Sequence, residues 1–316
     1  MVLQADSVSL AEIEAAADRI GPFIRATPLL AGDGLGYDGL WLKAESLQLT
    51  GSFKLRGALN AVIQLGPEER RRGVITLSAG NHGQALAYAA QRFGIPCAVV
   101  VREDASRTKL EAIERYGAEL ILVPVATWQQ RLEEEQAKRG SYLVHPFDDP
   151  AVVNGQGTVG LEILQALPQV RTVVVPVGGG GLISGVAAAI KNRRPEVRIV
   201  GIEPEGASVV SDSLAAGRPV PVERIATVAD GLAAPYTRPL NLALLKRYVD
   251  EVRTVSDTAI LEALRAIVSG SRLVVEPAGA AGVAGLASLD FNRPAVAILT
   301  GANVDRLQLG RWLSMQ

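Results

Sequence analysis

The sequence has one cysteine, two histidines and no surplus of charge of either sign. The single cysteine, Cys97, excludes an internal disulfide and fits a reducing compartment. It lies in the apolar run IPCAVVV, which is typical of a buried structural thiol rather than of a nucleophile. The 32 basic side chains balance 33 acidic ones and leave a net charge of −1. This balance gives no electrostatic footprint for nucleic acid, so we expect no such partner.

The pattern of a secretory signal is also missing, because the N-terminus combines a polar start with helical spacing. The uncharged stretch 172–190 contains four consecutive glycines, which favour a strand, a loop and a helix over a membrane span. No solenoid repeat and no low-complexity tail is present. We therefore expect a cytoplasmic protein without a membrane partner.

Short β-branched runs alternate with longer stretches at helical spacing. The expected strands include Val74–Ser78, Glu119–Val123, Tyr142–His145, Thr172–Val177, Thr254–Val255 and Ala295–Leu299. The expected helices include Asn81–Phe93, Gly155–Ala166 and Pro277–Leu289. Continuous apolar strands between amphipathic helices predict an α/β fold. Its open, twisted, parallel-type sheets are expected to carry helices on both faces.

The chain of 316 residues is long for a single core, which favours two domains. Residues 70–148 form a self-contained run of four βα units between the charged segment PEERRRG and the turn HPFDDP. We interpret this run as a small mobile domain. The expected large domain is discontinuous and consists of residues 1–69 and 149–316.

The segment GSFKLRG, residues 51–57, places Lys54 between a small-residue turn and the start of a helical pattern, with Phe53 directly before it. A lysine amine becomes a nucleophile when it is partly desolvated and close to an electrophile, and a Schiff base with a carbonyl cofactor meets both conditions. Most lysines are solvated surface residues, so this interpretation depends on three further segments.

The second segment, SAGNHGQA, follows the expected strand Val74–Ser78. A strand that leads through a small-residue turn into a helix presents backbone N–H groups to an anion. A plain helix cap with a tight turn is the alternative. We expect a substrate carboxylate to bind at Ser78, Ala79, Gly80, Asn81 and His82.

The third segment, PVGGGGLISG, follows the expected strand Thr172–Val177. Four glycines allow backbone amides to surround a phosphate without Cβ clashes, with a helix dipole behind them. The segment is neither a Walker A sequence nor a G-x-G-x-x-G motif. It therefore suits a single phosphate ester better than a pyrophosphate.

Two polar residues complete the inventory. Thr300 stands at the end of the expected strand Ala295–Leu299, where a hydroxyl can meet a ring nitrogen, and Glu276 precedes a small-residue helix as a candidate supporting acid. An amine, a carboxylate-sized anion loop, a single-phosphate loop and a hydroxyl for an aza-ring fit pyridoxal 5'-phosphate.

With these motifs the chain resembles the serine/threonine dehydratase (threonine ammonia-lyase) and serine racemase family of fold type II pyridoxal-phosphate enzymes, which share the tryptophan synthase β-like fold. The resemblance runs from about Thr27 to Asp305. Its specific motifs are GSFKLRGALN, SAGNHGQALAYAA, HPFDD, GQGTVGLEI, VGGGGLISG and VEPAGA.

The resemblance implies that Lys54 forms the Schiff base with the cofactor and that Asn81 binds its phenolic oxygen. It implies that Thr300 meets the pyridine nitrogen and that Phe53 packs against the ring. The residues expected to hold the phosphate are Gly178, Gly179, Gly180, Gly181 and Leu182. A homodimer is also expected from the family.

Positions at which this chain departs from the family pattern reduce the number of activities that we expect for it. Racemases carry a serine where this chain has Ala79, and a methyl group cannot carry a proton for exchange on the second face of the substrate. Val209 stands where an acidic residue would join Glu203 in the family's divalent-metal site, so we expect no metal. The prediction is β-elimination of a 3-hydroxy-amino acid, L-threonine or L-serine or both, to a 2-oxo acid and ammonia.

Three alternatives stay open at this stage. A dehydratase of the same scaffold could act on a hydroxyectoine-derived amino acid, 3-hydroxyaspartate or phenylserine, since one sequence does not show which pocket selects the β-substituent. A serine racemase is the second alternative. The third is a small-molecule-binding relative that has lost its chemistry.

Overall fold

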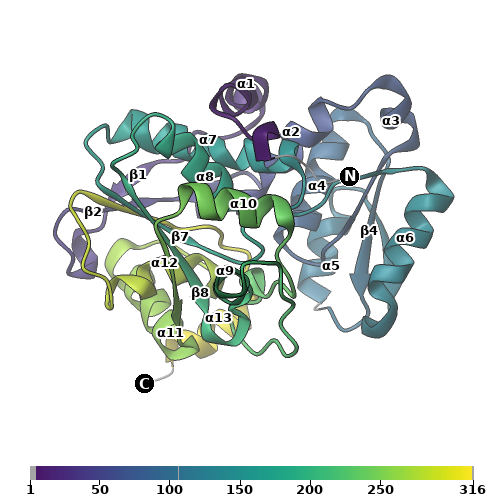
Figure 1. Cartoon of the computed structure of the whole chain (residues 1–316). Helices are drawn as coiled ribbons and strands as arrows, with labels where there is room; N and C mark the ends of the chain where they lie inside the picture. Colours follow the sequence, from purple (N-terminus) through teal and green to yellow (C-terminus); the bar gives the residue numbers. More distant parts are fainter. Residues whose placement is uncertain (1–4, 106, 315–316) are drawn as a thin grey trace.

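The computed structural model describes residues 5–105 and 107–314 and contains two mainly parallel sheets with helices packed around them (Figure 1). The larger sheet has the order β1-β2-β10-β7-β8-β9, and all its neighbouring strands are parallel except β1 and β2. Its strands are β1 (Leu29–Ala31), β2 (Leu40–Lys43), β10 (Ala295–Ile298), β7 (Thr172–Pro176), β8 (Arg198–Pro204) and β9 (Glu251–Val255).

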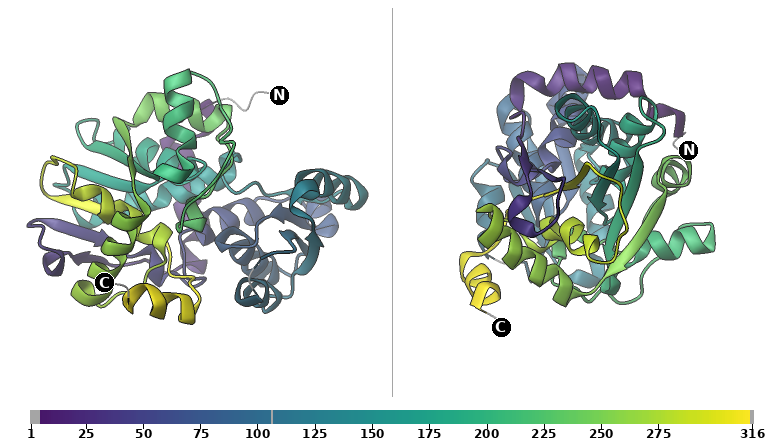
Figure 2. Two further views of the ribbon diagram at one scale, coloured as in Figure 1. Left: turned by 90° about the horizontal axis from the view of Figure 1, so that it is seen from below. Right: turned by 90° about the vertical axis from the view of Figure 1, so that its left-hand side faces the viewer.

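The smaller sheet has the order β5-β4-β3-β6 and is parallel throughout. Its elements lie together on one side of the molecule. This side is on the right in Figure 1 and also on the right in the left-hand view of Figure 2. Its strands are β5 (Glu119–Val123), β4 (Cys97–Arg102), β3 (Val74–Leu77) and β6 (Tyr142–Leu143). The two sheets thus use separate parts of the chain, the smaller one being drawn from within residues 74–143.

The helices cover both sheets, as continuous apolar strands require. The helices that precede the segment 172–176 are α1 (Leu10–Ile20), α2 (Lys54–Ile63), α3 (Pro67–Arg72), α4 (Asn81–Phe93), α5 (Arg107–Glu114), α6 (Trp128–Arg139) and α7 (Pro150–Ala166). Those that follow it are α8 (Gly181–Lys191), α9 (Val209–Ala216), α10 (Pro239–Tyr248), α11 (Asp257–Ala266), α12 (Pro277–Leu286) and α13 (Arg306–Ser314). No helix in the described ranges has the length and apolar character needed to cross a membrane.

The predicted α/β class with parallel-type sheets is confirmed, and two details of the strands differ. β1 was not predicted; it has only three residues and pairs antiparallel with β2 at the edge of the sheet. β9 begins at Glu251, earlier than the expected Thr254–Val255. Its first residues are polar or only partly buried at the opposite edge, so they lack the apolar signal on which the prediction relied.

Three helices whose starts were mispredicted or that were missed share one feature. α7 begins at Pro150 and not at Gly155, and α3 and α10 were not expected at all. Each has a proline at its first position, where the missing N–H costs no hydrogen bond. Asp149 caps α7 by accepting from the N–H of Ala151 over 2.8 Å. The short helix α13 was also missed.

Strand order explains how distant motifs meet. β2, β10 and β7 are adjacent and parallel, so their carboxyl ends lie at one edge of the larger sheet. The segment that leads to Lys54 follows β2, Thr300 follows β10, and the glycines 178–181 follow β7. Ligands of open α/β sheets bind outside this edge.

Candidate active site

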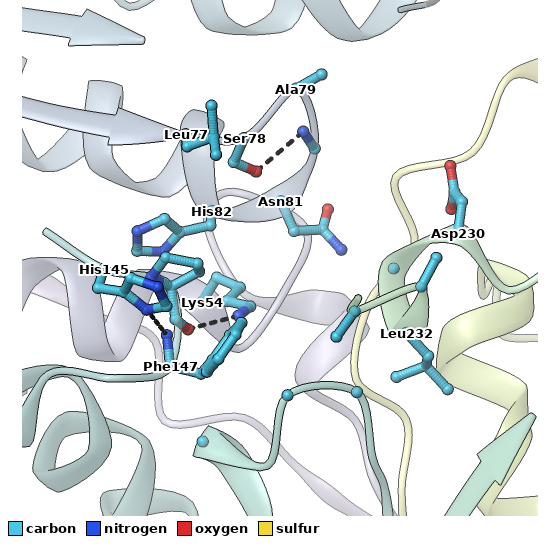
Figure 3. Close-up of a pocket in the computed structure, with 18 of the residues that line it drawn as sticks. Lys54, Leu77, Ser78, Ala79, Asn81, His82, His145, Phe147, Asp230 and Leu232 are labelled. Atoms are coloured by element: carbon cyan, nitrogen blue, oxygen red, sulfur yellow. Dashed lines mark hydrogen bonds between the residues drawn. The ribbon is translucent and has the colours of Figure 1, made fainter. Parts of the chain in front are cut away.

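A cavity of about 590 Å³ lies beyond the carboxyl ends of the strands and takes its walls from both sheets (Figure 3). This size is typical of small-ligand sites. The expected site residues that line it are Phe53, Lys54, Ser78, Ala79, Gly80, Asn81, His82, Gly178, Gly179, Gly180, Gly181, Leu182, Glu276 and Thr300. The structure therefore brings every predicted site residue to one cavity.

Lys54 is the first residue of α2 and is half-buried, with its side chain open to the cavity that it lines. Its Nζ donates to the carbonyl oxygen of Pro146 over 2.8 Å (Figure 3) and lies 5.2 Å from the centroid of the Phe53 ring. Desolvation by the surrounding protein lowers the pKa of Lys54 to about 8. Roughly a tenth of the amine is thus unprotonated and nucleophilic at pH 7, far more than for an ordinary lysine.

A buried ion-pair cluster holds the start of α2. The guanidinium of Arg56, two residues after Lys54, is fully buried and makes paired hydrogen bonds of 2.7–2.9 Å to Glu45 and to Glu162 of α7. Lys43 of β2 pairs with Glu162 as well. At its other end the segment is tied to the Thr300 loop by the N–H of Phe53, which donates to the carbonyl oxygen of Thr300 over 3.1 Å. The backbone that carries the amine is therefore fastened on both sides.

The N-terminus of α4 supplies the second wall. Its first N–H groups have no partner within the helix, so they are available to an anion, as predicted for a carboxylate. The N–H of Gly80 is the exception, since it donates to Oγ of Ser78 over 3.2 Å. Ring nitrogen Nε2 of His82 lies 2.9 Å from the carbonyl oxygen of Val144, and burial lowers the pKa of His82 to about 3. The neutral imidazole thus adds no positive charge for the carboxylate.

Asn81 is held in one orientation by residues from the other side of the cavity. Its Nδ2 donates to Oε1 of Glu276 over 2.6 Å, and its Oδ1 accepts from Nδ2 of Asn303 over 2.7 Å. One N–H of the Asn81 amide is left for a ligand oxygen. Burial, and secondarily the charge of Asp230, raises the pKa of Glu276 to about 8, so this carboxyl is largely protonated at neutral pH.

The glycine loop, residues 178–181, leads from β7 into α8 and points the unpaired N–H groups of that helix toward the cavity. Gly180 adopts φ of 97°, which favours glycine. The prediction attributed all four glycines to a phosphate. In the structure a Cβ on Gly179 or Gly181 would collide with Phe147, so a neighbouring side chain also requires glycine at these two positions.

Thr300 closes the cavity at the end of β10. It is buried, and its Oγ1 donates to the carbonyl oxygen of Ala278 over 3.3 Å. This long hydrogen bond is weak, so the hydroxyl can turn toward a ligand atom at small cost. The structure thus places Thr300 at the cavity, and its contact with a ring nitrogen stays a prediction.

Glu203 does not lie on this cavity. Both its oxygens are used at the start of α9, where they accept from the N–H groups of Val210 and Ser211 and from Oγ of Ser211 over 2.7–2.8 Å. Within residues 5–105 and 107–314 no three carboxylate, histidine or cysteine side chains gather in a way that could hold a metal ion. Glu203 is accordingly a helix cap here.

The sequence interpretation missed several residues that line the cavity. His145 was expected to be a turn residue, and its Nδ1 does accept from the N–H of Asp148 over 2.9 Å, but its ring also faces the cavity. Phe147, Asp230 and Asn303 were not singled out at all. Phe147 stands inside the motif HPFDD, and Asn303 lies three residues after Thr300 in the segment LTGANVD, so both had a local signal. Asp230 occupies a loop without a distinctive pattern.

Comparison with known proteins gives a consistent result. A family model described as pyridoxal-phosphate dependent enzyme matches residues 20–301. An L-threonine ammonia-lyase of Thermotoga maritima is 45% identical over 271 residues, which cover 84% of this chain and 67% of that protein. The structure of maize serine racemase superimposes with a TM-score of 0.91 at 34% identity and covers 96% of both chains. The crystal structure of a threonine deaminase from T.th. superimposes with a TM-score of 0.89 at 39% identity and covers 94% of this chain and 99% of that chain.

Proposed function

Since this chain belongs to the family of pyridoxal-phosphate dependent enzymes, we propose that it is an ammonia-lyase that converts L-threonine or L-serine to a 2-oxo acid and ammonia. One observation carries the proposal: Lys54, the glycine loop and Thr300 converge on one cavity from the ends of three adjacent strands. The 45% identity to a protein named L-threonine ammonia-lyase supports this choice of reaction.

The residues of the cavity fit pyridoxal phosphate. Lys54 offers a desolvated amine for the aldehyde. The glycine loop and the N-terminus of α8 suit one phosphate, and the Thr300 hydroxyl suits the ring nitrogen. The free N–H of Asn81 suits the phenolic oxygen, and Phe53 lies where a flat ring can pack. When bound, the cofactor withdraws electrons from Cα of the substrate and so makes its proton acidic.

The chain's own groups then perform the remaining tasks. The N–H groups at the start of α4 hold the substrate carboxylate. Nζ of Lys54, with a pKa of about 8, takes the proton from Cα as a general base. Ala79 offers no proton for the opposite face of Cα, so the electron pair of the Cα–H bond would form a Cα=Cβ double bond as the Cβ–O bond breaks. The 3-hydroxyl would leave as water with the proton that Nζ of Lys54 took. The released enamine would then tautomerise and react with water to give the 2-oxo acid and ammonia. Closure of residues 70–148 over the substrate, which we propose as the small mobile domain, excludes water.

The decisive experiment combines Lys54→Ala with a panel of hydroxy-amino acids. Purified protein incubated with pyridoxal phosphate should turn yellow, and borohydride should fix the vitamer on the peptide that contains residue 54. Ammonia and 2-oxo acid release should be highest for L-threonine or L-serine, and Lys54→Ala should lose more than the roughly 10²–10⁴-fold typical of a general base alone. Turnover of the variant within about tenfold of wild type would falsify the assignment.

One alternative has specific support. The similarity to maize serine racemase favours a test for racemisation of L-serine, which Ala79 argues against. The same panel should include 3-hydroxyaspartate, phenylserine and a hydroxyectoine-derived amino acid, because these compounds belong to the class of hydroxy-amino acids on which the proposed reaction acts. A homodimer is part of the proposal on family grounds, and sedimentation equilibrium of the purified chain tests it.

A further inference from the structure

The aromatic ring of Phe147 lies directly against the glycine loop. A Cβ placed on Gly179 would stand 2.5 Å from Cδ1 of this ring, and one placed on Gly181 would stand 2.8 Å from Cβ of Phe147. Real side chains do not approach so closely, and close-packed interiors have no spare room to relieve the clash. The absence of side chains at these two positions is therefore what admits the ring.

Phe147 is itself held in place by its neighbours. Its carbonyl oxygen accepts from Nδ2 of the buried Asn241 over 2.8 Å, and its N–H donates to Nδ1 of His145 over 3.3 Å. Its ring packs edge-on against the His145 ring at 4.6 Å and against the Tyr236 ring at 5.8 Å, measured between centroids. The side chain is only 9% exposed. These contacts restrict the ring to its position beside the loop.

The same short segment also reaches Lys54. Residues 144–149 join β6 of the smaller sheet to α7, and the Pro146 carbonyl within them accepts the hydrogen bond of the Lys54 amine (Figure 3). The residue next to Pro146 is Phe147. One rigid turn thus contacts both the amine and the glycine loop.

We propose that Phe147 is a positioning residue for the cofactor phosphate. Four consecutive glycines have more backbone freedom than any other tetrapeptide, and a loop that samples many conformations binds an anion weakly. The ring of Phe147 keeps the loop in the conformation in which the N–H groups at the start of α8 converge. This inference rests on the proposed function and adds a residue that supports the loop without binding the phosphate itself.

Comparing the binding of two vitamers distinguishes this positioning role from a general contribution of Phe147 to protein stability. Pyridoxal phosphate uses the loop, whereas pyridoxal has the same aldehyde and ring without the phosphate. Dissociation constants of both are measured by absorbance titration of the apoprotein. Phe147→Ala should raise the dissociation constant of pyridoxal phosphate by roughly tenfold or more and leave that of pyridoxal almost unchanged. Phe291→Ala, which removes a ring packed on Tyr37 elsewhere in the structure, should preserve the ratio of the two constants.

A reciprocal change tests the contact itself. Gly179→Ala alone should weaken the binding of pyridoxal phosphate but not that of pyridoxal, because its methyl group collides with the ring of Phe147. In the Phe147→Ala background the same methyl group has room, so the double variant should bind no worse than Gly179→Ala alone. If Phe147→Ala does not fold, Phe147→Leu gives the same ratio.

The inference would be overturned if Phe147→Ala lost equal affinity for both vitamers or lost affinity for neither. Additive losses of affinity in the double variant would overturn it as well. Failure of the wild-type protein to bind pyridoxal phosphate at all would instead refute the proposed function, so the two failures are distinguishable.

Discussion

The side-chain amide of Asn81 donates a hydrogen bond of 2.6 Å to Oε1 of Glu276. This contact joins the first residue of α4 to the residue that precedes α12. The two residues belong to opposite walls of the cavity. Asn303 also contacts Asn81, since its Nδ2 donates a hydrogen bond to Oδ1 of Asn81. The amide expected to contact the cofactor is thus oriented by a carboxyl group that burial keeps largely protonated at neutral pH.

Glu276→Gln should change how stability depends on pH. The folded-state pKa of Glu276 is raised to about 8 from an ordinary value of 4.5, so the folded protein holds a proton that the unfolded chain releases above pH 4.5. The stabilisation is complete below pH 4.5 and is lost as pH rises to about 8, by an amount on the order of a few kcal/mol.

Urea unfolding of the apoprotein between pH 5 and 9 measures this effect. Glutamine cannot ionise, so the variant should lose less unfolding free energy over this range than the wild type does. Glu223→Gln, at an exposed carboxylate, is the matched control and should follow the wild type. Identical slopes for the wild type and Glu276→Gln would contradict the raised pKa.

The rate of cofactor attachment should report the lowered pKa of Lys54. Only the neutral amine attacks a carbonyl, so the rate constant should rise with pH through a midpoint near 8 and level off above it. Stopped-flow absorbance after mixing apoprotein with pyridoxal phosphate between pH 7 and 10 gives the profile, in a range above the second phosphate ionisation. A rate that still climbs steeply at pH 10 would show an ordinary, solvated lysine.

Arg56→Met should destabilise the apoprotein by about 3–5 kcal/mol, because Glu45 and Glu162 lose their buried partner. Glu45 is fully buried and keeps only the hydroxyl of Thr27, which is neutral, and the amine of Lys43 at 3.9 Å. Urea denaturation measures the change. Arg71→Met removes an exposed ion pair with Glu68 and serves as the control, with an expected effect within about 0.5 kcal/mol. Similar effects of the two substitutions would mean that the buried cluster contributes little.

Ala79→Ser should introduce racemisation of L-serine. Ala79 lines the cavity at the start of α4, so a hydroxyl placed there can carry a proton on the face opposite Lys54. A chiral assay of recovered serine detects the D-enantiomer. Ala105→Ser makes the same change elsewhere on the cavity wall and should leave the product stereochemistry unchanged. Racemisation by both variants or by neither would refute the role assigned to position 79.

The sequence predicted the long periodic elements best. Helix α4 was expected at its observed bounds, and so was strand β5. Helices α3 and α10, which open on a proline, were not predicted, because proline at the first helical position resembles a turn. Helix α12 also opens on a proline, and its run of small residues was nevertheless expected to be helical from Pro277 onward. The candidate residues of the cavity were found because glycine runs and a lysine in a small-residue turn leave a local pattern. Asp230 leaves none, and Asn303 was passed over although it lies in the segment LTGANVD beside Thr300.

Local chemistry alone determined that this chain alternates strands and helices, and that it carries a candidate amine, two small-residue loops that suit anions, and a hydroxyl at a strand end. Those features are properties of neighbouring residues, so they can be read without a structure. Only the tertiary structure decided that Phe147 occupies the space beside Gly179, that Asn81 pairs with Glu276, and that Lys54 and Glu276 have shifted pKa values. Burial and contact between residues distant in the chain depend on how the strands are ordered, and no local pattern encodes the distance between two side chains.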